Sequence, residues 1–209
     1  MRAGTQNQLS RKRNTYRGAS KLVSANFLAD AEETGFDTDG YVETTIVYLL
    51  RERSVEFVSG HSESRTEVLL KQAVKGISKG KWNGLGGKIE RSDANPEASA
   101  AREVHEESGL VVQSLIYHGM LLFNFDGKPG IACYVYSTKD FQGSLKESDE
   151  GKLNWFDLLA LPFNEMWPDD RYWLLDTLLD GAKLRGTFDY ADSKVMHVEL
   201  SRHVAKEVK

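Results

Sequence analysis

The sequence has little of what would place it in a membrane, an oxidising compartment or a nucleic-acid complex. Its 209 residues contain one cysteine, Cys133, which excludes an intramolecular disulfide and a zinc site built on cysteines. No apolar run approaches the roughly 20 residues that a membrane-spanning helix needs. The net charge of −4 argues against broad nucleic-acid binding. We therefore expect no membrane partner and no stable nucleic-acid partner.

The start of the chain has two segments of opposite charge, the first without acidic side chains and the second without basic ones. Residues 1–27 carry six basic and no acidic side chains, whereas residues 28–40 carry five acidic and no basic ones. Apolar residues are sparse, so we expect a disordered polar tail over residues 1–40. An arginine-rich, acid-poor start also resembles a mitochondrial transit peptide. We expect a cytoplasmic protein, with mitochondria as the alternative, and one domain over 41–204 followed by a short tail at 205–209.

Beyond the tail, hydrophobic patterns and turn residues predict an α/β domain. A strand is expected over 42–50, then a long loop or extended hairpin, and a short second strand over 68–70. Glycine-rich residues 76–87 predict a loop. Further strands are expected within 111–125, 131–137, 153–157 and 187–200, and a second helix over about 167–180. The expected architecture is a mixed sheet between helices.

One segment combines helix signals with a row of acids. Asn95 is a favourable N-cap, Pro96 suits the first helical position, and Gly109 suits a left-handed C-cap. Three glutamates at i, i+3 and i+4 then fall on one helix face: Glu103, Glu106 and Glu107. Adjacent carboxylates repel unless a cation lies among them, and such hard oxygen ligands favour Mg²⁺ or Mn²⁺. The alternative is a solvated acidic helix.

Residues 87–110 resemble the Nudix box, G-x5-E-x7-R-E-U-x-E-E-x-G-U, in which U is aliphatic. The first glutamate of the pattern falls at Asp93, and the interval from there to Arg102 is one residue longer than the pattern. The resemblance implies a Nudix α/β/α sandwich with a mixed β-sheet. It also implies catalytic roles for Glu103, Glu106 and Arg102. The implied metal ligands are Glu103, Glu106, Glu107, Glu150 and the carbonyl of Gly87.

Two further strings, GKWNGLGG at 80–87 and MWPDDRYW at 166–173, look like the Nudix subgroup that hydrolyses oxidised purine nucleoside triphosphates such as 8-oxo-dGTP. In that subgroup a tryptophan stacks on the purine and two acids bind the base edge. Adjacent carboxylates in a dry pocket cannot easily both ionise, so one should keep its proton. The substrate-binding residues implied by the resemblance are Asn83, Trp167, Asp169, Asp170, Phe123 and Thr45.

The sequence departs from this subgroup at three positions. A pocket phenylalanine is replaced by Ile77, a nearby lysine by Ala73, and a methionine after the metal-binding glutamate by Gly151. These changes make the pocket rim smaller and less basic, so the preferred base stays open. For the acids after Pro168 the alternative is an ordinary helix start, and for Phe123 it is core packing.

The expected function is therefore a Mg²⁺-dependent pyrophosphohydrolase, with Mn²⁺ as a possible substitute. It would convert an oxidised purine nucleoside triphosphate to the monophosphate and pyrophosphate, acting as a monomer on a small-molecule nucleotide. Two alternatives stay open. One is a Nudix hydrolase of ADP-ribose, a dinucleoside polyphosphate or an RNA cap, and the other is a nucleotide-binding sensor with little turnover.

Overall fold

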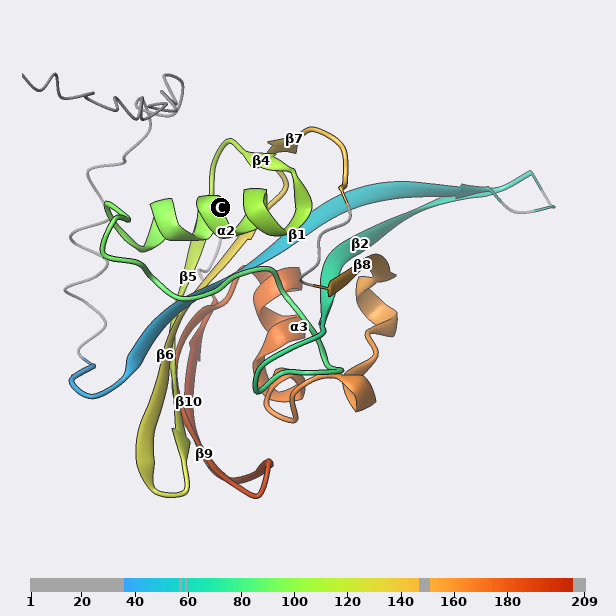
Figure 1. Ribbon diagram of the computed structural model, residues 1–209. Coiled ribbons are helices and arrows are strands. Elements are labelled where there is room, and N and C mark those ends of the chain that lie inside the picture. The colour runs from blue at the N-terminus through green and yellow to red at the C-terminus, as the bar shows by residue number, and fades with distance from the viewer. Residues whose placement is uncertain (1–35, 57, 59, 147–150, 205–209) are drawn as a thin grey trace, which may run out of the picture. The chain divides into compact units, whose positions relative to one another are not determined.

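The computed structural model describes residues 36–56, 58, 60–146 and 151–204. Residues 1–35, Glu150 and residues 205–209 lie outside the described part, so the tails stay predictions. Within it, two α-helices lie on opposite faces of a mixed sheet (Figure 1), and this confirms the expected α/β/α sandwich. The helices are α2 (Pro96–Ser108) and α3 (Asp170–Asp180). Neither is long and apolar enough to cross a membrane, and the described residues form no other α-helix.

The large sheet has the strand order β10-β9-β5-β6-β1-β2-β3, and β8 also pairs with β2. Two pairs, β1 with β6 and β5 with β9, are parallel, while the other pairs are antiparallel. Its strands are β1 (Val42–Glu56), β2 (Ser62–Ala73), β3 (Trp82–Asn83), β5 (Ile116–Phe125), β6 (Lys128–Thr138), β8 (Gly151–Asp157), β9 (Lys183–Ala191) and β10 (Lys194–His203). A separate small sheet pairs β4 (Val111–Val112) with β7 (Phe141–Gln142), and two 3₁₀ turns, η1 (Leu158–Ala160) and η2 (Phe163–Glu165), precede α3.

Of the two alternatives expected after the first strand, a long loop or an extended hairpin, the structure has the extended hairpin. β1 and β2 stay paired from Leu49 opposite Leu69 out to Glu56 opposite Ser62, so the short second strand expected over 68–70 was wrong in length. The outer part is polar on both faces, and it is held by cross-strand charges rather than by apolar burial. Glu67, for example, receives hydrogen bonds from Arg51 at 2.8 Å and from Arg53 at 3.0 Å. Because hydrophobic alternation is the main strand signal, a polar ladder escapes it.

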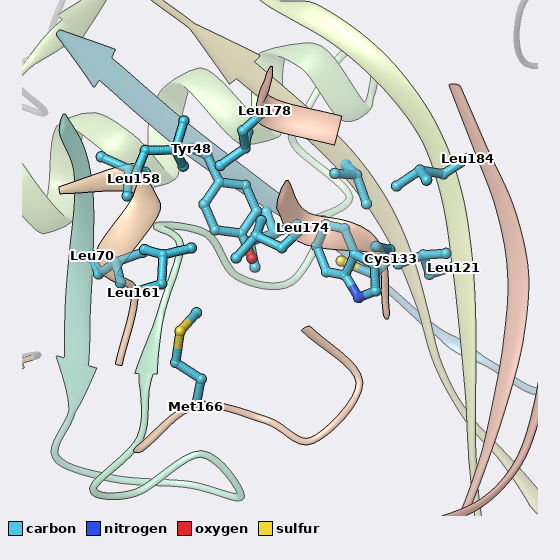
Figure 2. Close-up of a cluster of buried hydrophobic side chains, with 14 of the residues drawn as sticks. Tyr48, Leu70, Leu121, Cys133, Leu158, Leu161, Met166, Leu174, Leu178 and Leu184 are labelled. Carbon is cyan, nitrogen blue, oxygen red and sulfur yellow. The ribbon is translucent and has the colours of Figure 1, made fainter. Parts of the chain in front are cut away.

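Side-chain alternation along β1 divides the core into two layers. Ile46, Tyr48 and Leu50 face the α3 side, where Tyr48 lies edge-on to Trp173 with ring centroids 5.9 Å apart. Figure 2 shows this cluster, with Tyr48 in the middle of leucines from several elements. On the other face, Val47 and Leu49 pack with the α2 residues Ala100 and Val104.

Helix α2 has the predicted ends. The Asn95 side chain accepts a hydrogen bond from the Ala98 N–H at 2.8 Å, and Pro96 is the first helical residue. Gly109 closes the helix with φ of 72°, and its N–H bonds the His105 carbonyl. These caps fix where the helix starts, and so fix which side of it the glutamates occupy.

Helix α3 begins at Asp170, three residues later than the sequence pattern suggests. The Asp170 carboxylate accepts the backbone N–H of Trp167 at 3.1 Å and holds the preceding residues in a turn. Asp169 occupies the N-cap position but makes no capping hydrogen bond with its side chain. The Asp169 carboxylate is therefore available for other contacts.

Candidate active site

A glycine-rich stretch, residues 84–87, lies between strand β1 and helix α2, which carries the three glutamates. Thr45 and Val47 on β1 hydrogen-bond to the backbone of Gly87 and Leu85, at 2.9 and 2.6 Å. Gly86 has φ of 152°, and a Cβ there would lie 2.0 Å from the Thr45 carbonyl oxygen. A Cβ on Gly87 would lie 2.6 Å from the carboxylate of Glu103. Only glycines allow the strand, this loop and α2 to approach so closely.

Arg102 organises the acids on the exposed side of α2. Its Nε and Nη2 each donate to the Asp93 carboxylate at 3.0 Å. Its Nη1 donates to Glu103 at 2.8 Å and to Glu106 at 3.0 Å. The Arg102 hydrogen bonds lower the pKa of Asp93 to about 2. Asp93, at the departure from the Nudix-box pattern, is therefore a bidentate anchor for the arginine that orients both glutamates.

Glu107 is the buried member of the three glutamates, with 2% of its side chain exposed. One carboxylate oxygen accepts the Gly86 N–H at 3.0 Å, and the other accepts a hydrogen bond from the Lys71 ammonium. Loss of solvent raises the pKa of Glu107 to about 7, and the Lys71 charge acts against that rise. Burial also raises the pKa of Glu103, with Arg102 opposing. These carboxylates are costly to ionise without a cation.

The three glutamates supply the hard oxygen donors that a divalent cation needs, and the missing Cβ of Gly87 leaves the Glu103 carboxylate against open backbone. Within the described residues, no three His, Cys, Asp or Glu side chains lie close enough together to hold a metal as they stand. Arg102 and Lys71 hold the carboxylates instead. The glutamate oxygens can bind a hard metal ion once it displaces the Arg102 and Lys71 side chains from them. Glu150, the further predicted ligand, lies outside the described residues.

A cavity of about 280 Å³ opens beside this glycine stretch. It brings together all six residues expected to bind substrate, which come from β1, β3, β5 and the α3 entry. Gly86, Gly87 and Lys88 line the same cavity, so its wall continues toward the helix that carries the glutamates. The expected substrate residues on its wall are Thr45, Asn83, Phe123, Trp167, Asp169 and Asp170.

The acid pair is almost fully buried at the start of α3. One Asp169 oxygen accepts the Tyr190 hydroxyl, and the other accepts Trp173 Nε1–H at 2.9 Å. Desolvation raises the pKa of both carboxyls, and the Asp169 charge raises that of Asp170 further. The expected shared proton therefore has a physical basis, because two adjacent anions in this cavity would repel each other.

Trp167 is held with its ring toward the cavity. Its Nε1–H donates to the Ser78 hydroxyl at 2.9 Å, and its ring meets Tyr190 edge-on at 5.5 Å. The Lys81 ammonium lies 5.2 Å from the ring centroid. Trp82 instead packs edge-on against Phe156, with ring centroids 4.8 Å apart.

The remaining expected residues take several roles in the cavity wall. Phe123 lines the cavity and stacks on Phe188 at 5.6 Å, so pocket lining and core packing hold together. Asn83 accepts the Gly84 N–H at 3.0 Å through its side-chain oxygen, which leaves its amide N–H groups for a ligand. Thr45 Oγ1 is buried and has no hydrogen-bond partner in the described part of the chain, so it is an unsatisfied polar atom on the cavity wall.

Sequence reasoning missed several residues of this site. Tyr190 lies on β9, where Leu184, Gly186 and Phe188 also point into the core, so strand alternation was the available signal. Lys71 follows three buried apolar residues of β2, and a charge at the end of such a run is a signal for a buried partner. Cys133 also lines the cavity and belongs to no motif, whereas Trp173 lines it as the last residue of the MWPDDRYW string and was given no role of its own.

Comparison with known proteins agrees with this geometry. The sequence profile of the NUDIX domain matches residues 51–177. The chain is 39% identical over 126 residues to a mouse protein named oxidized purine nucleoside triphosphate hydrolase, covering 60% of this chain and 80% of that protein. A zebrafish protein of the same name is 35% identical over 130 residues, covering 62% and 82%.

A crystal structure titled as a mutator MutT protein from Bacillus halodurans superposes with a TM-score of 0.60 at 25% identity, covering 77% of this chain and 97% of that one. The profile match spans the outer end of β1 and all of β2, the glycine stretch, the carboxylate helix and most of the acid-pair helix. Family members generally depend on a divalent metal, for which the glutamates of α2 provide donors. The chain belongs to the Nudix family.

Proposed function

We propose that the protein hydrolyses oxidised purine nucleoside triphosphates such as 8-oxo-dGTP to the nucleoside monophosphate and pyrophosphate, with Mg²⁺ as the metal and Mn²⁺ as a possible substitute. One observation carries the proposal. The same cavity wall runs from the acid pair, Asp169 and Asp170, along Gly86 and Gly87 to the helix of the three glutamates. The mouse and zebrafish relatives, both named for this activity, support the assignment.

The acid-pair end of the cavity suits a purine. The Trp167 indole offers a flat apolar surface whose orientation Ser78 fixes, and base–aromatic stacking contributes about 1–3 kcal/mol. One protonated and one ionised carboxyl provide a donor and an acceptor side by side, which a base edge can match. Thr45 Oγ1 adds a further polar atom that has no hydrogen-bond partner among the residues that the structure describes.

The glycine end suits the phosphate chain. Gly86 and Gly87 let a phosphate approach the backbone, and Lys88 on the cavity wall provides positive charge. Glu103, Glu106 and Glu107 would hold Mg²⁺, which when bound neutralises phosphate charge and activates water for attack on phosphorus. Arg102 keeps Glu103 and Glu106 oriented through the anchor on Asp93.

A substrate panel tests this function. Loss of substrate and formation of nucleotide product would be followed by chromatography with Mg²⁺ on 8-oxo-dGTP, 2-hydroxy-dATP, dGTP and ADP-ribose, because ADP-ribose yields AMP and ribose 5-phosphate and no pyrophosphate. We expect kcat/KM to be highest for an oxidised purine triphosphate. Product analysis should give the monophosphate and pyrophosphate. Equal or faster hydrolysis of ADP-ribose, or absence of turnover on all four compounds, would reject the assignment.

The Trp167→Ala variant provides the matched control for that panel. It removes the stacking surface and leaves the glutamates of α2 untouched. Turnover of every purine substrate should fall, because stacking does not distinguish one base edge from another. Hydrolysis that is unaffected by this change would mean that the cavity binds only the phosphates.

A further inference from the structure

The hydrogen bonds around Asp169 favour its ionised form, because both partners donate to it. Trp173 Nε1–H can only donate, and it donates to one oxygen at 2.9 Å. The other oxygen contacts the Tyr190 hydroxyl. Within the described residues that hydroxyl has no second hydrogen-bond partner, so its own proton points at Asp169. Both carboxylate oxygens of Asp169 therefore accept.

Asp170 is arranged differently. Its Oδ2 accepts the backbone N–H of Trp167 at 3.1 Å, whereas Oδ1 has no hydrogen-bond partner in the described part of the chain. Only 2% of the residue is exposed, and it lines the cavity. A carboxyl with one free oxygen facing a ligand site can carry a proton there and donate it to a ligand.

We propose that Tyr190 is a positioning residue that places the shared proton of the acid pair on Asp170, so that Asp169 acts as the acceptor and Asp170 as the donor toward a bound base. The proton assignment concerns the free protein. Its consequence for substrate choice rests on the function proposed above. Nothing in the box or in the tryptophan motif carries this role, because Tyr190 comes from β9.

The surrounding charges are compatible with this arrangement. Tyr48 and Cys133 lie within electrostatic range of the pair, and burial raises the pKa of both, so neither adds a charge at neutral pH. Lys81 is the cation that acts on Asp170, and it favours ionisation there. Burial and the Asp169 charge have larger effects on the pKa of Asp170 than Lys81 has.

A proton fixed on Asp170 sets the order of hydrogen-bond donor and acceptor that the acid pair presents to a base. A base must offer an acceptor to Asp170 and a donor to Asp169. The edge of 8-oxoguanine runs from its O6 carbonyl acceptor to its N–H donors, whereas that of 2-hydroxyadenine, in its keto form, runs from its amino donor to its 2-carbonyl acceptor. The opposite order requires the proton on Asp169, which would break the hydrogen bonds from Tyr190 and Trp173. The protein should therefore hydrolyse these two oxidised purines unequally.

The test compares Tyr190→Phe with Tyr172→Phe as the matched control. Tyr190→Phe removes one hydroxyl and keeps the ring that packs on Phe125 and Trp167. Tyr172 is 45% exposed on α3, and its hydroxyl makes no contact with the acid pair. Both variants lose the same atom, so a shared effect would be nonspecific.

The first readout needs no substrate. Carboxyl ¹³C NMR titration, assigned through Asp169→Asn and Asp170→Asn, should show Asp169 ionised and Asp170 protonated near neutral pH. Tyr190→Phe should move the titration of both carboxyls, with Asp169 becoming easier to protonate, while Tyr172→Phe should match the wild type. Unchanged titration in Tyr190→Phe, or a proton on Asp169 in the wild type, would overturn the proposal.

The second readout is the ratio of kcat/KM for 8-oxo-dGTP to that for 2-hydroxy-dATP. Tyr190→Phe should move this ratio toward one by at least about fivefold, the size expected for one hydrogen bond to a charged group, and chiefly through KM. An unchanged ratio with normal turnover would overturn the inference. If the carboxyl titration shifts as expected but neither compound is hydrolysed, the proposed function fails and the proton assignment stands.

Discussion

The Lys71 ammonium and the Glu107 carboxylate form an ion pair in the glutamate cluster of the site, with both side chains largely buried. Lys71 comes from β2 and Glu107 from α2, so the pair joins the sheet to the helix. Within the described ranges, Glu107 has one other hydrogen bond, from the Gly86 N–H. Without a metal, Lys71 thus provides the positive charge that this buried carboxylate requires, and a bound cation would compete for the same oxygen.

Lys71→Met should make the fold more dependent on metal. Breaking a buried ion pair lowers the free energy of unfolding by about 3–5 kcal/mol, and protonation of Glu107 would offset part of this loss. We expect a lower melting temperature without metal and a larger rise on adding Mg²⁺ than in the wild type, measured by scanning calorimetry. Lys152→Met, an exposed lysine on neighbouring β8, is the control. An equal Mg²⁺ effect in Lys71→Met and the wild type would show that Lys71 and the metal do not compete.

Glu106→Gln should abolish most turnover and barely change stability. The Glu106 side chain is 58% exposed, and among the described residues it hydrogen-bonds Arg102 alone, so the fold loses little. Loss of an anionic metal ligand should remove on the order of 3–5 kcal/mol of transition-state stabilisation, a rate loss of roughly 10²–10⁴. Glu97→Gln in the first turn of the same helix controls for a general charge effect. More than a tenth of wild-type kcat at saturating Mg²⁺ would contradict the role.

His118 should make stability depend on pH. Its ring is buried between the Ala182 carbonyl at 3.2 Å and the Ser137 hydroxyl at 2.7 Å, and desolvation lowers its pKa to about 4 from 6.5. A lowered pKa means that the unfolded state takes up a proton first. The contribution of His118 is therefore complete above pH 6.5 and is lost as the pH falls toward 4, by about 3 kcal/mol.

This prediction is measured as the difference in unfolding free energy between the wild type and His118→Gln across that pH range. The comparison is needed because Glu107, with a pKa raised to about 7, acts in the opposite direction. Its neutral form is favoured in the folded state, so stability rises as the pH falls through 7. If the difference between the two proteins does not vary with pH, His118 is not held neutral by the fold.

The two members of the acid pair should respond unequally to amidation. Asp169→Asn turns an N–H group toward Trp173 or Tyr190, both of which donate at that position. Asp170→Asn keeps a donor like the protonated acid. Each change should lower kcat/KM for the oxidised purine, by roughly 5–150-fold, with the larger loss for Asp169→Asn. Wild-type kinetics in both variants would mean that the two acids after Pro168 serve only to start helix α3.

The polar N-terminal residues should be dispensable for catalysis, because their composition cannot bury much apolar surface. The boundary, however, should precede Phe36. Phe36 packs beside Tyr41, and the Arg185 guanidinium lies 4.5 Å from its ring centroid. A protein starting at Thr34 should keep its melting temperature and kcat/KM, whereas one starting at Asp39 should lose about 1 kcal/mol of stability. Loss of activity in the longer protein would show that the removed residues act on the site.

The sequence predicted those parts of the site whose residues lie close together in the chain. The caps at Asn95 and Gly109 and the spacing of the glutamates lie within one helix, so their geometry follows from helical periodicity. The pairing of Arg102 with Glu106, one turn apart, could be foreseen for the same reason.

The parts that escaped prediction depend on long-range contacts. Lys71 meets Glu107 only because β2 and α2 approach in the fold. Tyr190 meets Asp169 only because β9 joins the sheet in parallel with β5. The polar arm of the β1–β2 hairpin likewise has cross-strand partners in place of an apolar pattern. No local pattern determines which strands become neighbours.

The parallel pairing of β5 with β9 also sets an order of assembly. Gly119 lies opposite Leu184, so the segments that meet there are separated by α3 and much of the C-terminal half of the chain. Such non-local pairs close late during folding. During synthesis the carboxylate helix emerges long before β9, so a growing chain has its phosphate-binding half before the residue that sets the proton of Asp170. The residue proposed to set base selectivity is therefore among the last parts of the domain to be placed, and loss of the final two strands would remove it together with the core residues Leu184 and Phe188.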